Sequence, residues 1–374
     1  MRVILHETRS GEPLRELSFS AVTWSTAVCA ADDVSVTVPG FTRAAEGLRG
    51  LIVPKKMTVT VSDEDGRCLA AGIIGIPEAG EDDDGSPSVT VPGSGPEQAI
   101  FERRHVLPYP YGSLVDQQGY PDPRYDTRLS GIEYGTMMKR LYQQAMRHPG
   151  GELPVVWESD RGGTRQRGWY AVDGKPVQEA VRDLSELLGG VEWDWVPTLD
   201  ESDRLRWAFR TGADASPEIT SAFWHSWSQG GKSPDIRRLR EKVSSEFLAS
   251  TAVFTGGKDE DRVLVSQRTD PTLINAGFPL MEVWDTSHSS VSEQATLNGW
   301  RDARLAEGQT PILYWSFDVR ADRAVAIRKG DWCTIDIEDH WWIPDGTYTR
   351  RVIGVSGSAD DDWLGVTVAG EASW

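Results

Sequence analysis

Short alternating apolar segments at both ends of the chain are the feature that most constrains its fold. Near the start, VSVTVPG (34–40) and MTVTVSDEDG (57–66) place apolar side chains at every second residue, and the second segment runs into an Asp-Gly turn. Near the end, residues 328–370 read RKGDWCTIDIEDHWWIPDGTYTRRVIGVSGSADDDWLGVTVAG, in which turns separate three strand patterns. This period of two residues predicts short strands, and their spacing is typical of a small barrel or sandwich.

The middle of the chain mixes helical and strand patterns. GIEYGTMMKRLYQQAMRHPGG (131–151) keeps its apolar residues at helical spacing until His-Pro-Gly stops the pattern. KPVQEAVRDLSELLGG (175–190) carries a second apolar stripe that ends at Leu188. VEWDWVP (191–197) and RLRWAF (204–209) follow as a hairpin, which predicts a small α/β unit with the helix before it.

A third helix is expected over residues 289–309, where Ser290 and Glu293 have the spacing of a capping box. The predicted fold class is mainly β with α+β insertions, in which two small β-barrel-like domains bracket mixed α/β domains. The predicted divisions are 1–95, an N-terminal β-barrel-like domain; 96–175, an insertion with a Pro/Tyr-rich loop and a helix; 176–215, a small α/β unit; 216–308, a β segment with long connections and a connecting helix; and 309–374, a C-terminal β-barrel-like domain.

Composition excludes several classes of protein. The chain has 374 residues, 39% of them hydrophobic, and a net charge of −18, so it is expected to be globular and to repel the phosphates of nucleic acid. No apolar run reaches the length of a membrane span, and the four-residue apolar run near the start is too short for a secretory leader, so none is expected. Cys29, Cys68 and Cys333 form no CxxC pair, so neither a disulfide framework nor a zinc site is expected, and Cys333 is expected to be buried.

Glu192 and Asp194 are the residues most like a catalytic pair. The strand period places both carboxylates on one face, about 6 to 7 Å apart, with Trp193 and Trp195 on the other face. Two such carboxylates beside indoles are what a glycosidase uses. The simpler interpretation is a half-buried strand with its tryptophans inward and its acids in water, because nothing nearby would raise the pKa of either acid.

The other candidate sites are incomplete. GEDDDG (80–85) places Asp82 and Asp84 in calcium-loop register, but Val91 stands where a bidentate Glu is needed. The six histidines have no metal-ligand spacing, and the sequence contains no nucleophile elbow, phosphate loop or dinucleotide fingerprint. No catalytic, cofactor-binding or metal-binding residue is therefore predicted.

Aromatic residues give the candidate interaction surfaces. The sixteen tryptophans lie mostly within strand patterns, which favours core packing and subunit contacts over sugar stacking. Two segments could present aromatic rings to a partner, namely the Pro/Tyr-rich loop 108–126 and FWHSWSQGGKSP (223–234). The candidate interaction residues are Phe223, Trp224, Trp227, Tyr109, Tyr111 and Tyr120.

The order of these phrases resembles a known family, the hub proteins at the distal end of phage tails, often called minor tail proteins. The residues that carry the resemblance are Gly330-Asp331, the strand Trp332 to Ile337, Gly346-Thr347-Tyr348, Arg351-Val352-Ile353-Gly354, the preceding helix with Leu297, Trp300 and Arg304, the early VSVTVPG, and the EWDW strand after an amphipathic helix. The resemblance spans nearly the full length of the chain.

The resemblance implies a structural hub without enzymatic activity or cofactor. It implies a homotrimeric ring in the virion, at the tip of a long non-contractile tail, that joins the tail tube to the tip and lines the DNA conduit. The implied partners are two further copies of the chain, tail-tube and distal tail proteins above, fibre or receptor-binding proteins below, and DNA in transit. Many relatives continue into lysin or receptor-binding domains, so here another protein is expected to supply that part. The rival hypothesis is a carbohydrate-binding or carbohydrate-hydrolysing protein that uses the tryptophan-rich surface with Glu192 and Asp194.

Overall fold

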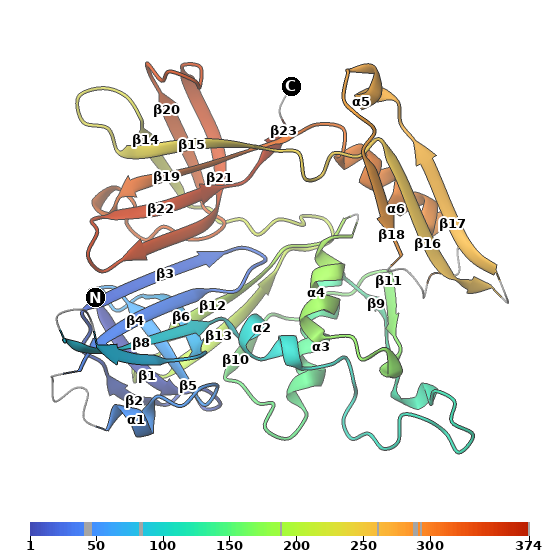
Figure 1. Ribbon diagram of the computed structural model, residues 1–374, viewed down its shortest axis with the longest axis horizontal. Coiled ribbons are helices and arrows are strands. Elements are labelled where there is room, and N and C mark those ends of the chain that lie inside the picture. The colour runs from blue at the N-terminus through green and yellow to red at the C-terminus, as the bar shows by residue number, and fades with distance from the viewer. Residues whose placement is uncertain are drawn as a thin grey trace. The chain divides into compact units, whose positions relative to one another are not determined.

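The computed structural model describes residues 1–40, 47–81, 85–187, 189–259, 262–286, 291 and 294–372 (Figure 1). They divide into two compact units. Unit 1 comprises Met1–Ser185, Gly190–Arg238 and Phe317–Thr367, and unit 2 is built mainly from Leu239–Ser316.

The first part of unit 1 is a sheet of short strands, as the alternating pattern predicted. Val34, Val36 and Val38 are all buried on one face, because the strand period places every second residue toward the core. The main strand order is β3-β4-β8-β6-β5-β1-β2, with β7 paired to β8. The elements are β1 (Arg2–Glu7), β2 (Pro13–Glu16), β3 (Ala21–Ala27), β4 (Asp33–Pro39), α1 (Leu48–Leu51), β5 (Met57–Ser62), β6 (Cys68–Ile74), β7 (Glu78–Glu81) and β8 (Pro87–Ser94).

The C-terminal strands continue the same sheet. The long strand β21 (Gly346–Ser358) pairs with β20 over its first half and with β3 over its second half. Strands from the two ends of the chain therefore meet side by side (Figure 1). The order continues β21-β22-β19-β15, with β14 parallel to β20 and β23 on β19. These strands are β14 (Trp224–Ser228), β15 (Ile236–Ser244), β19 (Ile312–Arg320), β20 (Trp332–Ile337), β22 (Trp363–Val368) and β23 (Glu371–Ala372). A 3-10 turn, η5 (Ala321–Arg323), follows β19.

The α/β part of unit 1 contains the two predicted helices, α3 (Tyr134–Met146) and α4 (Val177–Ser185). Its core is an aromatic cluster of Phe101, Tyr142, Trp195 and Phe209, whose ring centroids lie 4.5 to 5.8 Å apart. These rings join α3 to the sheet β10-β13-β12. The remaining elements are α2 (Pro96–Ala99), the 3-10 turns η2 (Phe101–Arg103), η3 (Pro123–Tyr125) and η4 (Ala171–Asp173), and the strands β9 (Thr127–Ile132), β10 (Val155–Trp157), β11 (Arg165–Trp169), β12 (Trp193–Leu199) and β13 (Leu205–Thr211).

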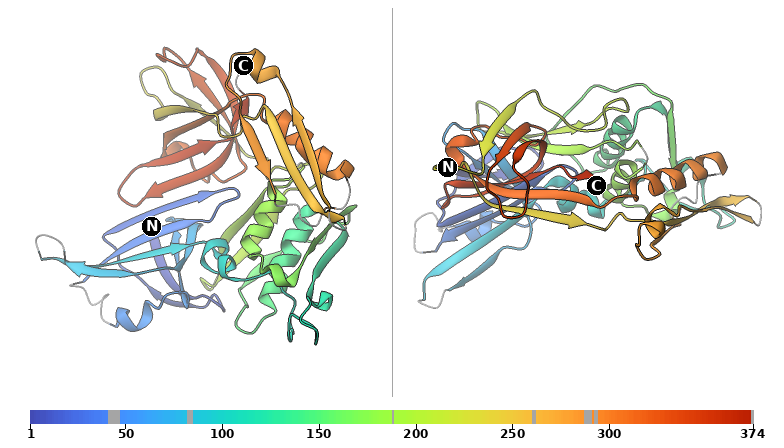
Figure 2. Two further views of the ribbon diagram at one scale, coloured as in Figure 1. Left: turned by 45° about the vertical axis from the view of Figure 1, so that its right-hand side comes forward. Right: turned by 90° about the horizontal axis from the view of Figure 1, so that it is seen from above.

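Unit 2 is a three-stranded sheet covered on one face by α6 (Gln294–Glu307), as Figure 2 shows. The strand order is β17 (Arg262–Thr269), β16 (Thr251–Asp259) and β18 (Glu282–Asp285), and α5 (Thr272–Asn275) lies between β17 and β18 in the chain. Phe254 and Leu297 are buried between sheet and helix. The predicted capping box at Ser290 and Glu293 lies outside the described residues, as does Leu188.

The prediction of a mainly β fold with α+β insertions is confirmed. Among the described residues the main strand path is open, with β2 and β15 at its two ends, so these pairings do not close a barrel. Cys333 is buried in β20, as expected. No helix in the described ranges is both long and apolar enough to cross a membrane.

Candidate functional site

Asp194 lies at the centre of a buried group of charges, in contrast to the expectation that it faces water. Its side chain is 0% exposed, and its Oδ1 lies 2.5 Å from Lys329 Nζ. Lys329 Nζ also lies 3.1 Å from Asp32 Oδ1, and Arg210 Nη2 lies 2.7 Å from Asp194 Oδ2. We call Asp32, Asp194, Arg210 and Lys329 the central ion-pair cluster. It joins the β3–β4 turn, β12, β13 and the turn before β20, all within unit 1.

Burial and the neighbouring charges shift the pKa values of Asp32 and Lys329 in the central ion-pair cluster. It raises the pKa of Asp32 to about 7, although the Lys329 ammonium opposes this shift. Burial also lowers the pKa of Lys329, but the carboxylates of Asp32 and Asp194 more than offset that effect, so the pKa lies above its ordinary value. Lys329 therefore stays charged and neutralises the acids around it.

Glu192 is held by a second ion pair beside this cluster. Arg351 Nη2 donates to Glu192 Oε1 at 2.6 Å, and Arg351 Nη1 donates to Glu192 Oε2 at 2.9 Å. The same Nη1 donates to the backbone oxygen of Ile219 at 3.0 Å. Glu192 and Asp194 are thus each bound by a cation from the C-terminal part of the chain, so neither carboxylate of this pair is free to act as acid or nucleophile.

The Gly-Asp turn before β20 has a structural explanation. Gly330 has φ of 94°, and a Cβ there would lie 2.9 Å from the backbone oxygen of Ile219, so the position requires glycine. Asp331 is buried, and its Oδ2 accepts from the backbone N–H of Arg328 at 2.8 Å and lies 3.1 Å from Nε2 of His225. Lys329, Gly330 and Asp331 therefore connect this turn to β12, to the 219–221 segment and to β14, respectively.

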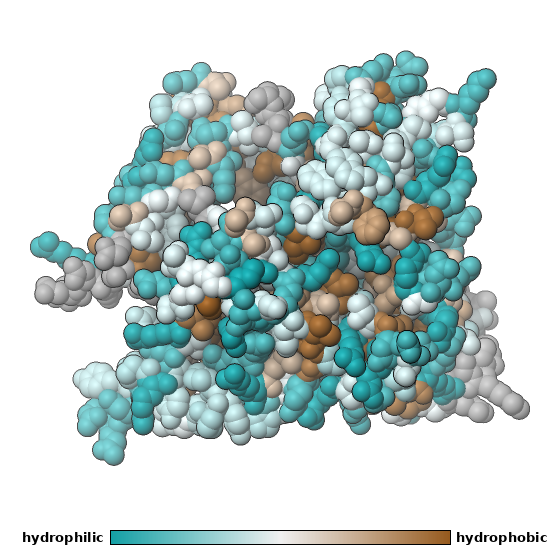
Figure 3. Space-filling model, turned by 180° about the vertical axis from the view of Figure 1, so that it is seen from behind, coloured by the Kyte–Doolittle hydropathy of each residue, from teal (hydrophilic) through white to brown (hydrophobic). Residues whose placement is uncertain are grey.

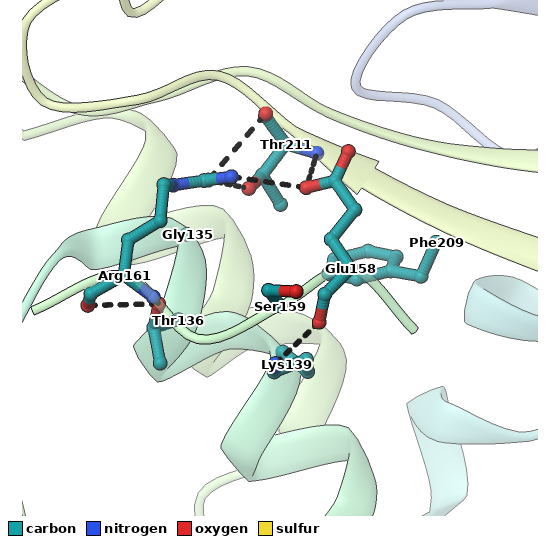
Figure 4. Close-up of a pocket in the computed structure, with 8 residues that line it drawn as sticks. All are labelled: Gly135, Thr136, Lys139, Glu158, Ser159, Arg161, Phe209 and Thr211. Carbon is teal, nitrogen blue, oxygen red and sulfur yellow. Dashed lines mark hydrogen bonds and ion pairs between the residues drawn. The ribbon is translucent and has the colours of Figure 1, made fainter. Parts of the chain in front are cut away.

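A small hollow in unit 1 lies between α3, the segment after β10 and β13 (Figure 4). Glu158 Oε2 lies 3.1 Å from Arg161 Nη1 and accepts from the backbone N–H of Thr211 at 3.3 Å. Lys139 Nζ donates to the backbone oxygen of Glu158 at 2.6 Å. Figure 4 shows Arg161 and Glu158 directed toward each other and toward Thr211, so the charged groups named here are bound by groups of the hollow itself.

The predicted residues in the 223–234 segment separate into exposed and buried positions. Phe223 and Trp224 are exposed, and the Trp224 ring stacks on Trp332 with centroids 5.7 Å apart. Trp227 is buried instead. It lies three positions after Trp224 on β14, and because successive side chains of a strand point to opposite faces, the two tryptophans lie on opposite faces. It packs edge-on against Phe317 at 5.7 Å.

The predicted tyrosines of the 108–126 loop are all exposed. The rings of Tyr109 and Tyr111 flank His148, with centroids 5.3 and 5.7 Å from it. The backbone N–H of Tyr120 donates to Asp116 Oδ1 at 2.9 Å, which shapes the far end of the loop. The loop is thus ordered by local contacts and presents aromatic rings outward.

The acidic turns provide no described metal site. Asp82 and Asp84 lie outside the described residues. In the SDEDG turn, Asp63 Oδ2 lies 2.8 Å from Arg67 Nε, so this carboxylate is already paired. Across the part of the chain that the structure describes, no three His, Cys, Asp or Glu side chains gather as metal ligands would.

Two groups of residues were missed by the sequence reasoning. Asp32 and Lys329 gave no local signal, and Arg351 entered only as part of the phrase Arg351-Val352-Ile353-Gly354, because the partners of all three lie far away in the chain. Trp341 and Trp342 are not among the predicted interaction residues, yet they are strongly exposed. The DHWW phrase between two strand patterns was the available signal for them.

Comparison with solved structures finds the same fold in phage tail proteins. The tail protein from Neisseria meningitidis matches with a TM-score of 0.57 and 15% identity, over 99% of this chain and 97% of that one. The 43 kDa tail protein of a prophage of Shewanella oneidensis matches with a TM-score of 0.55 and 14% identity, over 99% and 98%. A prophage tail protein from Listeria monocytogenes matches with a TM-score of 0.50 and 10% identity, over 98% and 94%.

No family model and no curated protein sequence matches the chain. The similarity to the tail proteins is thus one of fold, and it extends over almost the whole of both chains. The resemblance to tail hub proteins that the sequence phrases indicated is confirmed at this level.

Proposed function

We propose that this protein is a structural hub of a phage tail. The observation that carries the proposal is the match of fold over 99% of the chain to tail proteins from two different bacteria. In the proposed virion, three copies form a ring at the distal end of a long non-contractile tail. The ring joins the tail tube to the tip, and DNA passes through it.

The construction of unit 1 supports a structural role. One sheet runs from the N-terminal strands into the C-terminal strands through the pairing of β21 with β3. The ion pair of Lys329 with Asp32 joins the same regions a second time, and the pair of Arg351 with Glu192 joins β21 to the α/β part. Within the proposal, residues 1–95 and 309–374 supply the two barrel-like segments that each chain contributes to the ring.

The surface composition supports passage of DNA without binding. The net charge of −18 would repel phosphates that approach a lumen lined by this chain. The face in Figure 3 is mainly hydrophilic, with apolar residues scattered between polar ones. Contacts with tube proteins above and fibre or receptor-binding proteins below are assigned in the proposal to the exposed rings of Phe223, Trp224 and the 108–126 loop.

The rival hypothesis of a carbohydrate-active protein has less support. Its catalytic form needs Glu192 and Asp194 free, whereas Arg351 and Lys329 bind them. Its binding form needs exposed tryptophans; Trp227 is buried, but Trp224, Trp341 and Trp342 are exposed, so a titration with sugars has to decide this form.

Electron microscopy of the purified protein in negative stain, with its mass from light scattering, tests the proposal. We expect rings with a central hole and a mass three times the 41.4 kDa of one chain. A monomer whose tryptophan fluorescence shifts with capsular or cell-wall sugars would contradict the hub and support the carbohydrate hypothesis.

A further inference from the structure

The loop between β20 and β21, residues 338–345, presents two tryptophans on an ordered backbone. We call it the tryptophan loop. Asp339 donates its backbone N–H to Asp345 Oδ1 at 2.8 Å, which closes the loop across its base. His340 Nδ1 accepts from the backbone N–H of Ile343 at 3.0 Å, and the Ile343 side chain is buried. The backbone is therefore fixed before any partner arrives.

The two indoles at the tip are among the most exposed apolar side chains described. Trp341 is 86% exposed and Trp342 is 63% exposed, with ring centroids 5.5 Å apart and ring planes inclined by 48°. His340 stacks beside Trp341 with centroids 6.2 Å apart. Large aromatic side chains held in water on a rigid loop are typical of contact residues for another molecule.

The charge around the indoles indicates the chemistry of that molecule. Glu338, Asp339 and Asp345 are all exposed on the loop, and the sequence from 332 to 349 contains no Lys or Arg. The adjoining 229–235 segment meets Glu338 at Gly230 and carries one Lys and one Asp, so it adds no net charge.

Cations bind the face of an indole, and arginine does so most often. A guanidinium can also donate two parallel hydrogen bonds to a carboxylate. Indoles and carboxylates on one loop therefore fit an arginine-bearing partner. The same acids would repel anionic lipid headgroups.

We propose that the tryptophan loop docks an arginine-rich segment of another protein. Trp341 and Trp342 bind guanidinium planes on their faces, and Glu338 and Asp339 bind the edges. The proposal uses only residues of unit 1 and does not depend on the hub function.

Calorimetric titration of the full-length protein with a nona-arginine peptide, at about 50 and 150 mM salt, tests the proposal. We expect Trp341→Ala/Trp342→Ala to weaken binding about tenfold or more, since it removes both cation–indole contacts. Glu338→Gln/Asp339→Asn removes two charges but leaves Asp345 to close the loop, and it should weaken binding several-fold. The matched control is Trp284→Ala in unit 2, whose indole is 66% exposed and which should leave binding unchanged.

Three results would overturn the proposal. The first is equal binding of nona-arginine by Trp341→Ala/Trp342→Ala and by the unaltered chain, which would mean that general negative charge is responsible. The second is nona-lysine binding as tightly as nona-arginine, which would remove the role of the planar guanidinium. The third is a preference of the loop for vesicles of three parts phosphatidylcholine to one part phosphatidylglycerol, or for maltoheptaose, which would assign it to a membrane surface or a sugar.

Discussion

Lys329 neutralises buried carboxylates in the interior of unit 1. Lys329 lies between Asp32 and Asp194, both of which are buried, and it comes from the other end of the chain. Replacement by Met keeps much of the side-chain volume but leaves two buried carboxylates near each other. Removing one partner from a buried ion pair costs about 3 to 5 kcal/mol. We expect Lys329→Met to lower the free energy of unfolding by an amount in this range, measured by urea titration at pH 8.

Two further variants separate the effect of the lost charge of Lys329 from the effect of its lost packing. Arg9→Met breaks an exposed pair with Glu152 and should cost less than about 1 kcal/mol. Adding Asp32→Asn to Lys329→Met removes the carboxylate that loses its ion pair, since Asp194 keeps its pair with Arg210, and should restore part of the loss. If the double variant is no more stable than Lys329→Met alone, packing of the lysine chain matters more than its charge.

Glu97 should make the stability of unit 1 depend on pH near neutrality. Burial raises the pKa of this carboxyl to about 7, opposed by the hydrogen bond from Gln178 and by the charge of Arg182. Because the folded pKa exceeds the unfolded one, the folded protein binds the proton more tightly. This contribution to stability is full below about pH 4 and is lost as pH rises through about 7.

Glu97→Gln removes this titration while keeping the shape of the side chain. Relative to the variant, the unaltered chain should lose free energy of unfolding as pH rises from 5 to 8, by up to about 1.4 kcal/mol per pH unit. Urea titrations at each pH measure the difference. Glu64→Gln on an exposed turn serves as control, and a flat difference for Glu97→Gln would mean that its carboxyl is solvated.

At the scale of elements, local patterns predicted the strands and helices, and failed where distant residues decide burial. The period of two correctly predicted that Val34 and Val36 lie in the core, because a strand with one buried face has apolar residues at every second position. The same reasoning placed Asp194 in water. Its burial depends on Lys329 and Arg210, and the strand pattern contains no information about either.

The end of a helix is also poorly predicted from the local sequence pattern. The stripe predicted a helix over 175–190, and α4 ends at Ser185. Gly189 adopts φ of 66°, the left-handed conformation that glycine often takes after a helix, but it lies four residues beyond the last residue of α4. Existence and type of the helix follow from its apolar face, whereas its last residue depends on what the chain packs against next.

At the scale of the whole molecule, the order of weak phrases predicted the fold better than any one of them. Gly330-Asp331 is required by a close backbone approach, and Arg351 by its pair with Glu192. These two phrases therefore mark places where segments distant in sequence meet, so their positions report on the fold as a whole. The candidate interaction residues could be predicted only by type, because alternation along β14 buries Trp227 and exposes Trp224.

The division into two units predicts that most of unit 2 can be removed. It is inserted between β15 and β19, which are neighbours in the sheet. Glu241 and Trp315, near the two ends of the insertion, are joined by a hydrogen bond of 2.9 Å. Replacing residues 246–309 with a short Gly-Ser linker should therefore close β15 and β19 as a hairpin and leave unit 1 folded.

Cooperative urea unfolding of the shortened chain measures this. Since the central ion-pair cluster lies wholly in unit 1, Lys329→Met should destabilise the shortened and the full-length chains by equal amounts. A shortened chain that does not unfold cooperatively, or that is insensitive to Lys329→Met, would show that unit 1 needs unit 2 to form its core.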